Sequence, residues 1–323
     1  MKSKILALLL DAGSSYLSGE AMSETLGVSR AAVWKVIRQL REEGYKIEAI
    51  PRKGYRLVSQ PDQLSPDCLA PYLPTDFQLG SIHYFASTPS TNTEAKAIAW
   101  DAPEGTVVIA DEQTQGRGRR GRSWHSPANK NIYISLILKP DIPIQQVPMF
   151  TQMAAAAVWE TLSQELPGLK IKWPNDLMIN GKKVCGILTE MSGEMTGLHY
   201  LVIGIGINVN TESSDFPKDL RDIASSLRLE AGKPLSRQKL AAQLLVSLND
   251  HYRSVIESGS FERALAVCRA QSNLLGTAIN IHDRDQIRPG KAVEIDQNGF
   301  LVVETEKGLE RLSSGEVSIR KAK

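Results

Sequence analysis

The first sixty residues alternate apolar stretches with short polar turns, and this pattern predicts three helices followed by a hairpin. The apolar run at 5–10 indicates a short first helix. Ser18 and Ser29 are placed to cap a second and a third helix, and Gly27 between them can supply a left-handed turn. The third helix should extend to about Glu43. A helix, a tight glycine turn and a second helix are typical of a helix-turn-helix unit.

The third predicted helix has an apolar face and a basic face. Val33, Ile37 and Leu40 recur at helical spacing and should face the core. Strands at 46–50 and 55–57 then flank a basic turn, which predicts the wing of a winged helix-turn-helix. Basic side chains in these places suit a major groove and its phosphates, although a packing domain with solvated basic residues is the alternative. The residues predicted to contact DNA are Gly19, Ser29, Arg30, Ala31, Trp34, Lys35, Arg38, Arg52 and Lys53.

The pattern changes after this module. Residues 59–75 contain four prolines and little periodicity, which predicts a linker. An Asn-Gly pair at 180–181 indicates a tight hairpin, and the strand that follows it is apolar on both faces and should be central. The predicted strands lie at 106–110, 131–139, 170–173, 184–190 and 201–210, with shorter ones at 278–281, 292–295, 301–304 and 310–312. We therefore expect an α+β chain with domains at 1–62, 63–272 and 273–323.

Composition and charge support this division. The 323 residues are 42% hydrophobic and 23% charged, which is globular, and the net charge is only +2. Residues 1–60, however, hold ten Lys and Arg against six Asp and Glu, which favours an anionic partner for that module. The three cysteines are far apart and the histidines are scattered, which indicates free thiols and no metal cage. No stretch predicts a signal peptide or a membrane span, so we expect a cytoplasmic protein.

The most distinctive segment is GRGRRGR at 116–122, followed by Trp124, which could stack on a base. Its glycines let backbone N–H groups approach an anion, and its arginines are permanently charged donors for phosphate or carboxylate. The glycines formally match a dinucleotide-binding motif, but a strand rather than a helix is predicted next, at 131–139. A disordered tract that binds RNA is a second interpretation, although such tracts repeat and this one is a single copy. We favour an ordered loop that closes over a phosphate ester.

Two further features have a structural and a functional interpretation that spacing does not separate. Thr91 with Glu94 forms a capping box for a helix, but the polar groups of 90–92 could equally hold a polar ligand at the helix N-terminus. Lys183 enters a central strand, where it either extends its ammonium group to solvent or faces a ligand.

Two glycines at 204 and 206 lie within a predicted strand, where glycine often marks close approach by a ligand or by backbone. No acid and base pair, nucleophile motif or metal motif is evident. The chemistry should therefore depend on positioning and charge neutralisation rather than on covalent catalysis.

Together these motifs resemble the bifunctional biotin–protein ligases, which are also repressors of the biotin operon. The resemblance spans the whole chain, and the arginine-rich motif followed at this distance by KWPND is highly specific. It rests on GRGRRGR at 116–122 with Trp124, KWPND at 172–176, Lys183 before Gly186-Ile187-Leu188, GIGIN at 204–208 and SGEV at 314–317.

The resemblance implies a two-step reaction. The carboxylate of biotin attacks the α-phosphate of Mg²⁺-ATP and gives biotinyl-5′-AMP and pyrophosphate. The amine of a lysine on the biotin carboxyl carrier protein of acetyl-CoA carboxylase, or of a related carboxylase, then attacks this mixed anhydride. Because two anionic reactants meet, cationic donors should offset their repulsion, and losing one costs about 3–4 kcal/mol in the transition state.

Family position also implies roles for individual residues. Arg119 and Lys183 would be catalytic, and no residue is assigned as a metal ligand. The biotin-binding residues would be Ser90, Thr91, Asn92, Gln113, Arg117, Gly118, Arg119 and Lys183. The nucleotide-binding residues would be Gly116, Arg122, Trp124, Lys172, Asp176 and Asn208.

The resemblance further implies that biotinyl-5′-AMP is a corepressor that promotes homodimerisation and binding to operator DNA. The last domain would be a small SH3-like β-barrel beside a central mixed-sheet domain. Residues 211–223 lie where the family has a second mobile loop, but they are polar and acidic here, and we assign them no role. Two other functions stay open, namely a ligand-sensing transcription factor without ligase activity and a lipoate-type ligase.

Overall fold

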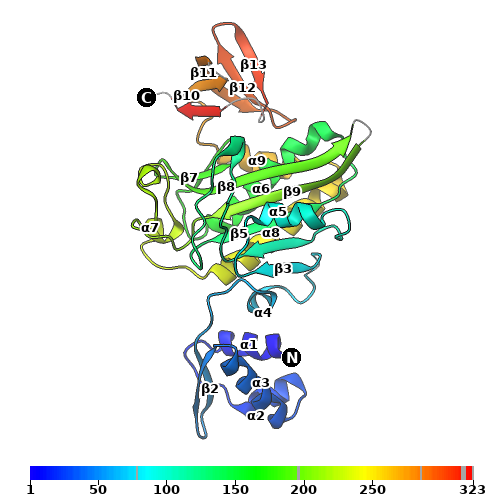
Figure 1. Ribbon diagram of the computed structural model, residues 1–323, viewed down its shortest axis with the longest axis vertical. Helices are drawn as coiled ribbons and strands as arrows, with labels where there is room; N and C mark the ends of the chain where they lie inside the picture. Colours follow the sequence, from blue (N-terminus) through cyan, green and yellow to red (C-terminus); the bar gives the residue numbers. More distant parts are fainter. Residues whose placement is uncertain (78, 195–196, 284–285, 314–317, 322–323) are drawn as a thin grey trace.

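The computed structural model describes residues 1–77, 79–194, 197–283, 286–313 and 318–321. The chain forms three bodies in a row, with a helical N-terminal module at one end, a large central domain, and a small sheet at the other end (Figure 1). The predicted α+β class is confirmed. The SGEV motif at 314–317 lies outside the described residues.

The N-terminal module has the predicted order of elements. Each predicted cap is present, because the hydroxyls of Ser18 and Ser29 accept a hydrogen bond from the amide three residues further on. Gly27 adopts the expected left-handed conformation, with φ of 64°. The elements are α1 (Lys2–Asp11), α2 (Gly19–Leu26), α3 (Arg30–Glu42), β1 (Lys46–Ile50) and β2 (Gly54–Ser59).

Helix α3 buries its apolar face and exposes its basic one, as predicted. Val33, Ile37 and Leu40 are in the core of the module, whereas Trp34 is 54% exposed with the Arg38 guanidinium over its ring. The wing packs closely against the helices. A Cβ at Gly54 would lie only 2.2 Å from the carbonyl oxygen of Leu17, which precedes α2. The module therefore presents one helix face and one hairpin together.

The segment predicted as a linker is a packed junction. It contains α4 (Pro66–Leu69) and the 3₁₀ turn η1 (Ala70–Tyr72). Cys68 packs in the core of the N-terminal module and Leu69 in the core of the central domain. The prolines concealed this helix from the sequence pattern, since Pro66 stands at the first helical turn, where proline is tolerated.

The central domain is built on a seven-stranded mixed sheet with the order β3-β4-β5-β9-β8-β7-β6. Among the neighbouring strands that the structure describes, β3 and β4 pair in parallel and the others pair antiparallel. Asn180 and Gly181 have φ of 49° and 78°, which confirms the predicted tight turn before β8. The strands are β3 (Ile82–Phe85), β4 (Val107–Ala110), β5 (Ile132–Leu138), β6 (Lys170–Lys172), β7 (Asp176–Ile179), β8 (Lys182–Glu194) and β9 (Gly197–Ile207). Because β5 follows the 116–122 segment, the dinucleotide-binding interpretation is excluded.

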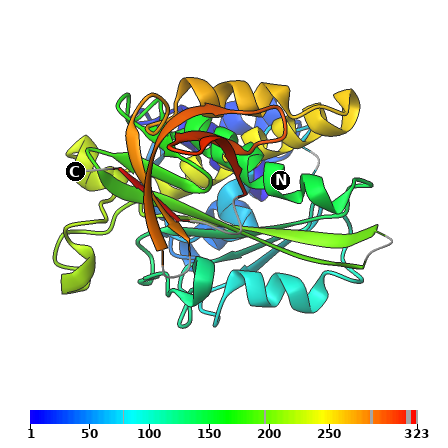
Figure 2. The same cartoon turned by 90° about the horizontal axis from the view of Figure 1, so that it is seen from above.

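Helices cover both faces of this sheet. On one face lie α6 (Val147–Leu162), α8 (Arg237–Ser258) and α9 (Glu262–Ala270), and on the other lies α5 (Thr91–Ile98), as Figure 2 shows from above. The domain also contains four short elements, namely η2 (Arg119–Gly121), η3 (Ile144–Gln146), η4 (Lys218–Leu220) and α7 (Leu227–Ala231). The candidate site lies on the face of the sheet that carries α5, at the point where this helix begins.

The C-terminal body is a five-stranded antiparallel sheet with the order β13-β12-β11-β10-β14, in agreement with an SH3-like domain. All four predicted strands are present. The strands are β10 (Ala278–Asp283), β11 (Gln286–Ile295), β12 (Leu301–Thr305), β13 (Gly308–Leu312) and β14 (Ser318–Lys321).

Two predictions concern the chain as a whole. The three cysteines are free thiols and all are buried. In the described part of the chain, no helix combines the length and the apolar character that crossing a membrane requires.

Candidate functional site

Two adjoining pockets lie where α5 meets β8 and β9. The strand pocket is lined by residues 90–92, Gln113, Arg117, 186–188 and 204–206. The loop pocket is lined by Arg120, 122–125, 172–174, Asp176, Asn208, Phe216, Leu220, Ile223 and Ala224. Five residues line both pockets, namely Gly118, Arg119, Trp124, Asn175 and Lys183. The pockets therefore join at two cations, an amide and an indole ring.

The polar end of the strand pocket is a hydrogen-bonded network at the start of α5. The amide of Thr91 donates to Gln113 Oε1 at 2.9 Å. The Ser135 hydroxyl lies 2.8 Å from the Thr91 hydroxyl and 2.6 Å from Asn92 Oδ1. Asn92 Nδ2 donates to Glu190 Oε2 at 2.8 Å, which fixes the orientation of the Asn92 amide because a carboxylate only accepts.

The predicted capping box is wrong. Ser90 rather than Thr91 precedes the first helical residue, and its side chain makes no cap hydrogen bond. Glu94 instead accepts from the Thr88 hydroxyl at 2.7 Å. Gln113 takes the place of a cap by accepting from the Thr91 amide, so the polar groups of 90–92 face the pocket. This geometry favours the ligand-binding interpretation.

The glycines of β9 leave room for two site side chains. A Cβ at Gly204 would lie 2.1 Å from Asn92 Oδ1, and a Cβ at Gly206 would lie 2.5 Å from Trp124 Nε1. Sequence analysis predicted close approach by a ligand or by backbone, whereas the approaching groups here are the side chains of Asn92 and Trp124. Strand β9 therefore sets the positions of both groups.

Strand β8 is central, as predicted, but it is not buried on both faces. Gly186, Leu188 and Glu190 point to the side of α5 and are only partly buried, while Val184 and Ile187 are buried. The sequence did not show this alternation of buried and partly buried positions, because the positions that face the site carry glycine and leucine as well as one acid.

The arginine loop, residues 116–122, is an ordered turn. The Gly118 amide donates to the Arg122 carbonyl at 2.7 Å, and the Trp124 amide donates to the Gly116 carbonyl at 2.8 Å. At its tip Arg120 has φ of 57°, a conformation in which a non-glycine residue is strained. The loop is therefore ordered, as expected, rather than a disordered tract, and its residues line both pockets.

Two cations at the junction of the pockets have fixed partners. Arg119 donates from Nη1 to Asn175 Oδ1 at 2.8 Å, and Lys183 Nζ lies 2.6 Å from Asp176 Oδ1. Burial lowers the pKa of the Arg119 guanidinium, which nonetheless stays charged at neutral pH. The Lys183 ammonium also lies 5.2 Å from the centre of the Trp124 ring. Both cations are therefore oriented toward the pockets.

The structure brings together almost all the residues predicted for ligands, although their roles in binding remain predictions. All eight residues predicted for biotin line the strand pocket. Arg122, Trp124, Lys172, Asp176 and Asn208 line the loop pocket. Gly116 lines neither pocket. A Cβ at this residue would lie 2.4 Å from the Trp124 carbonyl oxygen, so the tight turn requires glycine here.

The loop pocket has an apolar wall that the sequence pattern did not predict. Phe216, Leu220 and Ile223 line it from the 211–223 segment. His125 extends from the opposite side and its ring nitrogen lies 3.0 Å from the Asp215 carbonyl oxygen. Three apolar residues at four- and three-residue spacing within an acidic segment were the signal that could have found this wall.

The residues predicted to contact DNA lie apart from both pockets, on the N-terminal module. Those predicted on α3, together with the wing pair Arg52 and Lys53, are exposed, while Gly19 is partly buried at the start of α2. Apart from Gly19, their distribution over α3 with its N-cap and the adjacent hairpin fits a single nucleic-acid surface.

Each part of the chain is similar to known proteins. Residues 84–208 match the biotin/lipoate A/B protein ligase family, residues 2–56 match an HTH domain, and residues 274–320 match the biotin protein ligase C-terminal domain. The chain is 40% identical to the bifunctional ligase/repressor BirA of Bacillus subtilis (strain 168), over 99% of this chain and 98% of that protein. It is 31% identical to the bifunctional ligase/repressor BirA of Escherichia coli (strain K12), over 99% and 97%.

A solved structure shares the fold of three quarters of this chain. The biotin protein ligase from Aquifex aeolicus in complex with biotin and ATP is 29% identical, with a TM-score of 0.65. The match covers 75% of this chain and 99% of that chain.

Proposed function

Because the chain belongs to the family of bifunctional biotin–protein ligases and repressors, we propose that its strand pocket holds biotin and its loop pocket holds the nucleotide of ATP. The chain is an ATP-dependent ligase that joins biotin to protein, and it is a repressor of transcription. The assignment of ligands to the two pockets depends on one observation, namely that Arg119 and Lys183 line both pockets where they join. A carboxylate from one pocket and a phosphate from the other would meet between these cations.

The two pockets differ in chemistry as their ligands do. The strand pocket offers the hydroxyl and amide groups of Thr91, Asn92 and Gln113 to a polar ring, and an apolar path along Ile187 and Leu188 to an acyl chain. The loop pocket offers the Trp124 ring and the wall that includes Phe216 to a flat base.

In the first step, a biotin carboxylate oxygen attacks the α-phosphorus of ATP, and the bond from phosphorus to the pyrophosphate oxygen breaks. Asn175 holds Arg119 and Asp176 holds Lys183 before the ligands arrive. Donors fixed in advance stabilise the developing charge without reorganisation. The arginine loop covers the mixed anhydride and keeps water from it.

A magnesium ion would arrive with the ATP phosphates. Among the residues that the structure describes, no group of three metal-ligating side chains occurs. The carboxylate that lines the loop pocket belongs to Asp176, beside Lys183. One carboxylate with phosphate and water ligands suits Mg²⁺, so Asp176 would hold the ion, which supplies neutralisation of phosphate charge.

In the second step, the amine of a lysine on the carrier protein attacks the acyl carbon, AMP leaves with the bridging oxygen, and the amine loses a proton. A third hollow opens at Arg119 and is otherwise lined mostly by apolar groups, including Ile144, Val147 and Met191. We propose that the aliphatic part of the acceptor lysine enters there.

Pyrophosphate exchange into ATP tests the enzymatic proposal directly. The purified protein should exchange labelled pyrophosphate only when biotin and Mg²⁺ are present. No exchange under these conditions would overturn the proposal. Lipoate added as a competitor separates the lipoate-type alternative, because a biotin ligase should keep its biotin-dependent exchange and show none with lipoate alone.

The repressor proposal adds a partner and an assembly. Biotinyl-5′-AMP would act as corepressor by promoting a homodimer that binds two operator half-sites through α3 and the wing. A gel shift with operator DNA should tighten when biotin and ATP are both added, and should weaken steeply with salt. Binding that is indifferent to the ligands would exclude the corepressor role.

A DNA partner and the three free thiols lead us to place the protein in the cytoplasm.

A further inference from the structure

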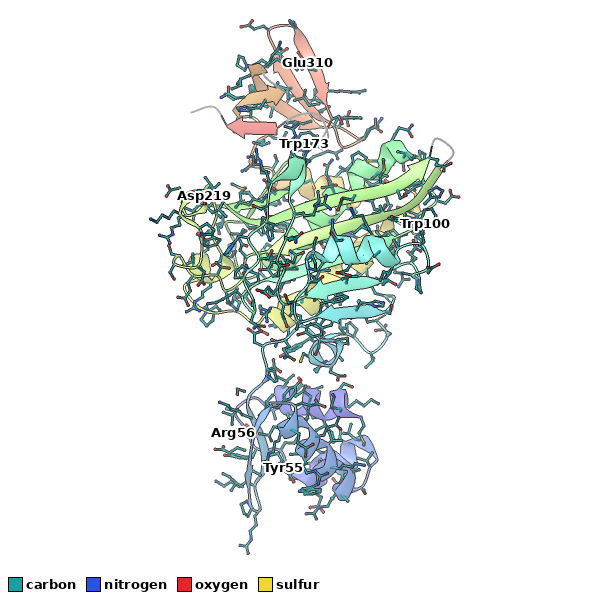
Figure 3. The ribbon with its side chains drawn as sticks, viewed as in Figure 1. Tyr55, Arg56, Trp100, Trp173, Asp219 and Glu310 are labelled. Carbon is teal, nitrogen blue, oxygen red and sulfur yellow. The ribbon has the colours of Figure 1, made fainter. Side chains whose placement is uncertain are left out.

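A backbone carbonyl between β11 and β12 of the C-terminal sheet contacts the ligase site. The indole nitrogen of Trp173 donates to the Gly299 carbonyl oxygen at 3.0 Å, and Gln152 Nε2 donates to the same oxygen at 2.7 Å. Figure 3 shows Trp173 at the junction of the central domain and the C-terminal sheet. Trp173 and Gln152 are 3% and 1% exposed, so both hydrogen bonds are protected from water.

The turn that carries this carbonyl is preorganised. Asp296 Oδ1 accepts from the amides of Asn298 and Phe300, and the Gly299 amide donates to the Asp296 carbonyl. Gly299 itself has φ of 77°, and a Cβ there would lie 2.4 Å from Gln152 Nε2. The turn therefore presents its oxygen in one fixed direction, and only glycine fits its tip.

Trp173 leads directly into the residues that orient the two cations. Asn175, two residues on, accepts from Arg119 and donates to the Ile187 carbonyl at 3.0 Å. Asp176, the next residue, pairs with Lys183. A displacement of Trp173 would therefore shift both cation partners along a very short stretch of backbone.

We propose that the C-terminal sheet is a positioning element for adenylate formation, and that the Gly299 carbonyl aligns Arg119 and Lys183 by holding Trp173 in place. The inference rests on the proposed function of the pocket junction and assigns a role to a domain that contributes no residue to either pocket among those described. Gln152 shares the carbonyl but lies on α6, away from both pockets, so it anchors the sheet without this connection.

A double-mutant cycle tests the proposal on the full chain. The variants are Trp173→Phe, Gly299→Ala and the double variant, with Gln152→Leu as the matched control. Biotin-dependent pyrophosphate exchange gives kcat and KM for ATP, and calorimetry gives the Kd for biotin. Wild-type exchange in the same assay reports on the proposed function, so only the variants report on the positioning role.

We expect each single variant to lower kcat/KM for ATP by about 10- to 100-fold, because small misplacements of reacting groups are costly. The Kd for biotin should change less than threefold. The double variant should be no worse than the more damaged single one, since Trp173→Phe removes the donor of one hydrogen bond and Gly299→Ala displaces its acceptor. Gln152→Leu should lower the melting temperature but keep kcat/KM within threefold of wild type.

Three results would overturn the proposal. They are a Gly299→Ala variant that keeps wild-type kcat/KM for ATP, single-variant losses that multiply in the double variant, and a Gln152→Leu variant as inactive as the other two. If Gly299→Ala does not fold, Trp173→Phe compared with Gln152→Leu decides, since equal activity of these two variants would also overturn it.

Discussion

At the position of Arg119, several requirements of acyl adenylation meet in one side chain. Its guanidinium lines both pockets, is partly shielded from water, and is held by the Asn175 amide at 2.8 Å. Arg120, one residue on, carries the same charge at the exposed tip of the loop. Charge alone therefore does not distinguish the two residues, but their geometry does.

Replacing Arg119 by glycine should loosen retention of biotinyl-5′-AMP more than it weakens binding of biotin. In the proposed arrangement the guanidinium faces the phosphate, and losing one such donor typically costs about 10²- to 10³-fold in rate. Dissociation of the adenylate, followed by stopped flow, and calorimetry with biotin measure the two effects. Arg120→Gly is the matched control and should lose much less, because Arg120 lines the loop pocket alone and not the junction of the two pockets. Equal weakening of both ligands in Arg119→Gly would reject the assigned role.

Glu190 governs the pH dependence of the polar cluster at the start of α5. Burial raises its pKa, but hydrogen bonds from Lys96 and Asn92 and the nearby Arg117 lower it more, so the folded pKa lies below the usual value. A depressed folded pKa contributes stability that is fully present above the unfolded pKa of about 4.3 and is lost as pH falls through the folded value.

The wild-type protein should therefore be more stable than Glu190→Gln at pH 5 to 8, by a constant difference in unfolding free energy. Below about pH 4.3 that difference should shrink, because the wild-type carboxyl takes up a proton. Urea denaturation at several pH values measures it. A difference that grows as the pH falls would show that the folded state raises this pKa instead.

At the scale of elements, β9 divides the site into its two halves. Its glycines at 204 and 206 leave space for Asn92, on the side proposed for biotin, and for Trp124, on the side proposed for the nucleotide. Positions 204 and 206 lie on the same face of β9, because side chains alternate along a strand. A single methyl group at either position should therefore disturb one ligand and spare the other.

Gly204→Ala should weaken biotin binding and Gly206→Ala should weaken ATP binding, each by about tenfold or more, given the clash with a site side chain. Gly197→Ala serves as the control on the same strand, since in the described part of the chain no heavy atom lies within 4 Å of the added methyl group. Calorimetry with biotin and with a non-hydrolysable ATP analogue measures both. Equal loss of both ligands in each variant would refute this division.

Much of this arrangement could be predicted from the sequence, because local patterns specify local structure. The caps at Ser18 and Ser29 and the Asn180-Gly181 turn depend on a few neighbouring residues, and all are present. The capping box at Thr91 failed because Gln113, distant in sequence, provides the acceptor instead. The apolar wall around Phe216 was missed because only tertiary packing turns it toward a pocket.

At the scale of the whole molecule, Arg237 links the central domain to the segment that leads into it from the N-terminal module. It is fully buried at the start of α8, and it donates to Asp62 Oδ1 and to Asp111 Oδ1, each at 2.9 Å. It also donates to the Asn131 carbonyl at 2.8 Å. Asp111 directly follows β4, so one guanidinium connects the junction segment to the sheet that carries the site.

Removing this side chain should be strongly destabilising. Arg237→Met would leave Asp111 buried without its charge partner, and the unfolding free energy should fall by about 3–5 kcal/mol. Arg253→Met on the same helix is the control, because its ion pair with Glu257 is exposed and should contribute less than about 1 kcal/mol. Guanidinium denaturation measures both. Similar small losses in the two variants would show that the buried network is not needed for the junction.

The central claim is that one acyl-adenylate lies across both pockets beneath the arginine loop. A crystal structure of the protein grown with biotin, ATP and Mg²⁺ tests it most directly. The acyl chain should lie along Gly204 and Leu188, the base should lie beside Trp124, and Arg119 and Lys183 should contact the phosphate. A structure in which the ligand occupies only one pocket, or in which the arginine loop points away from the phosphate, would contradict the account.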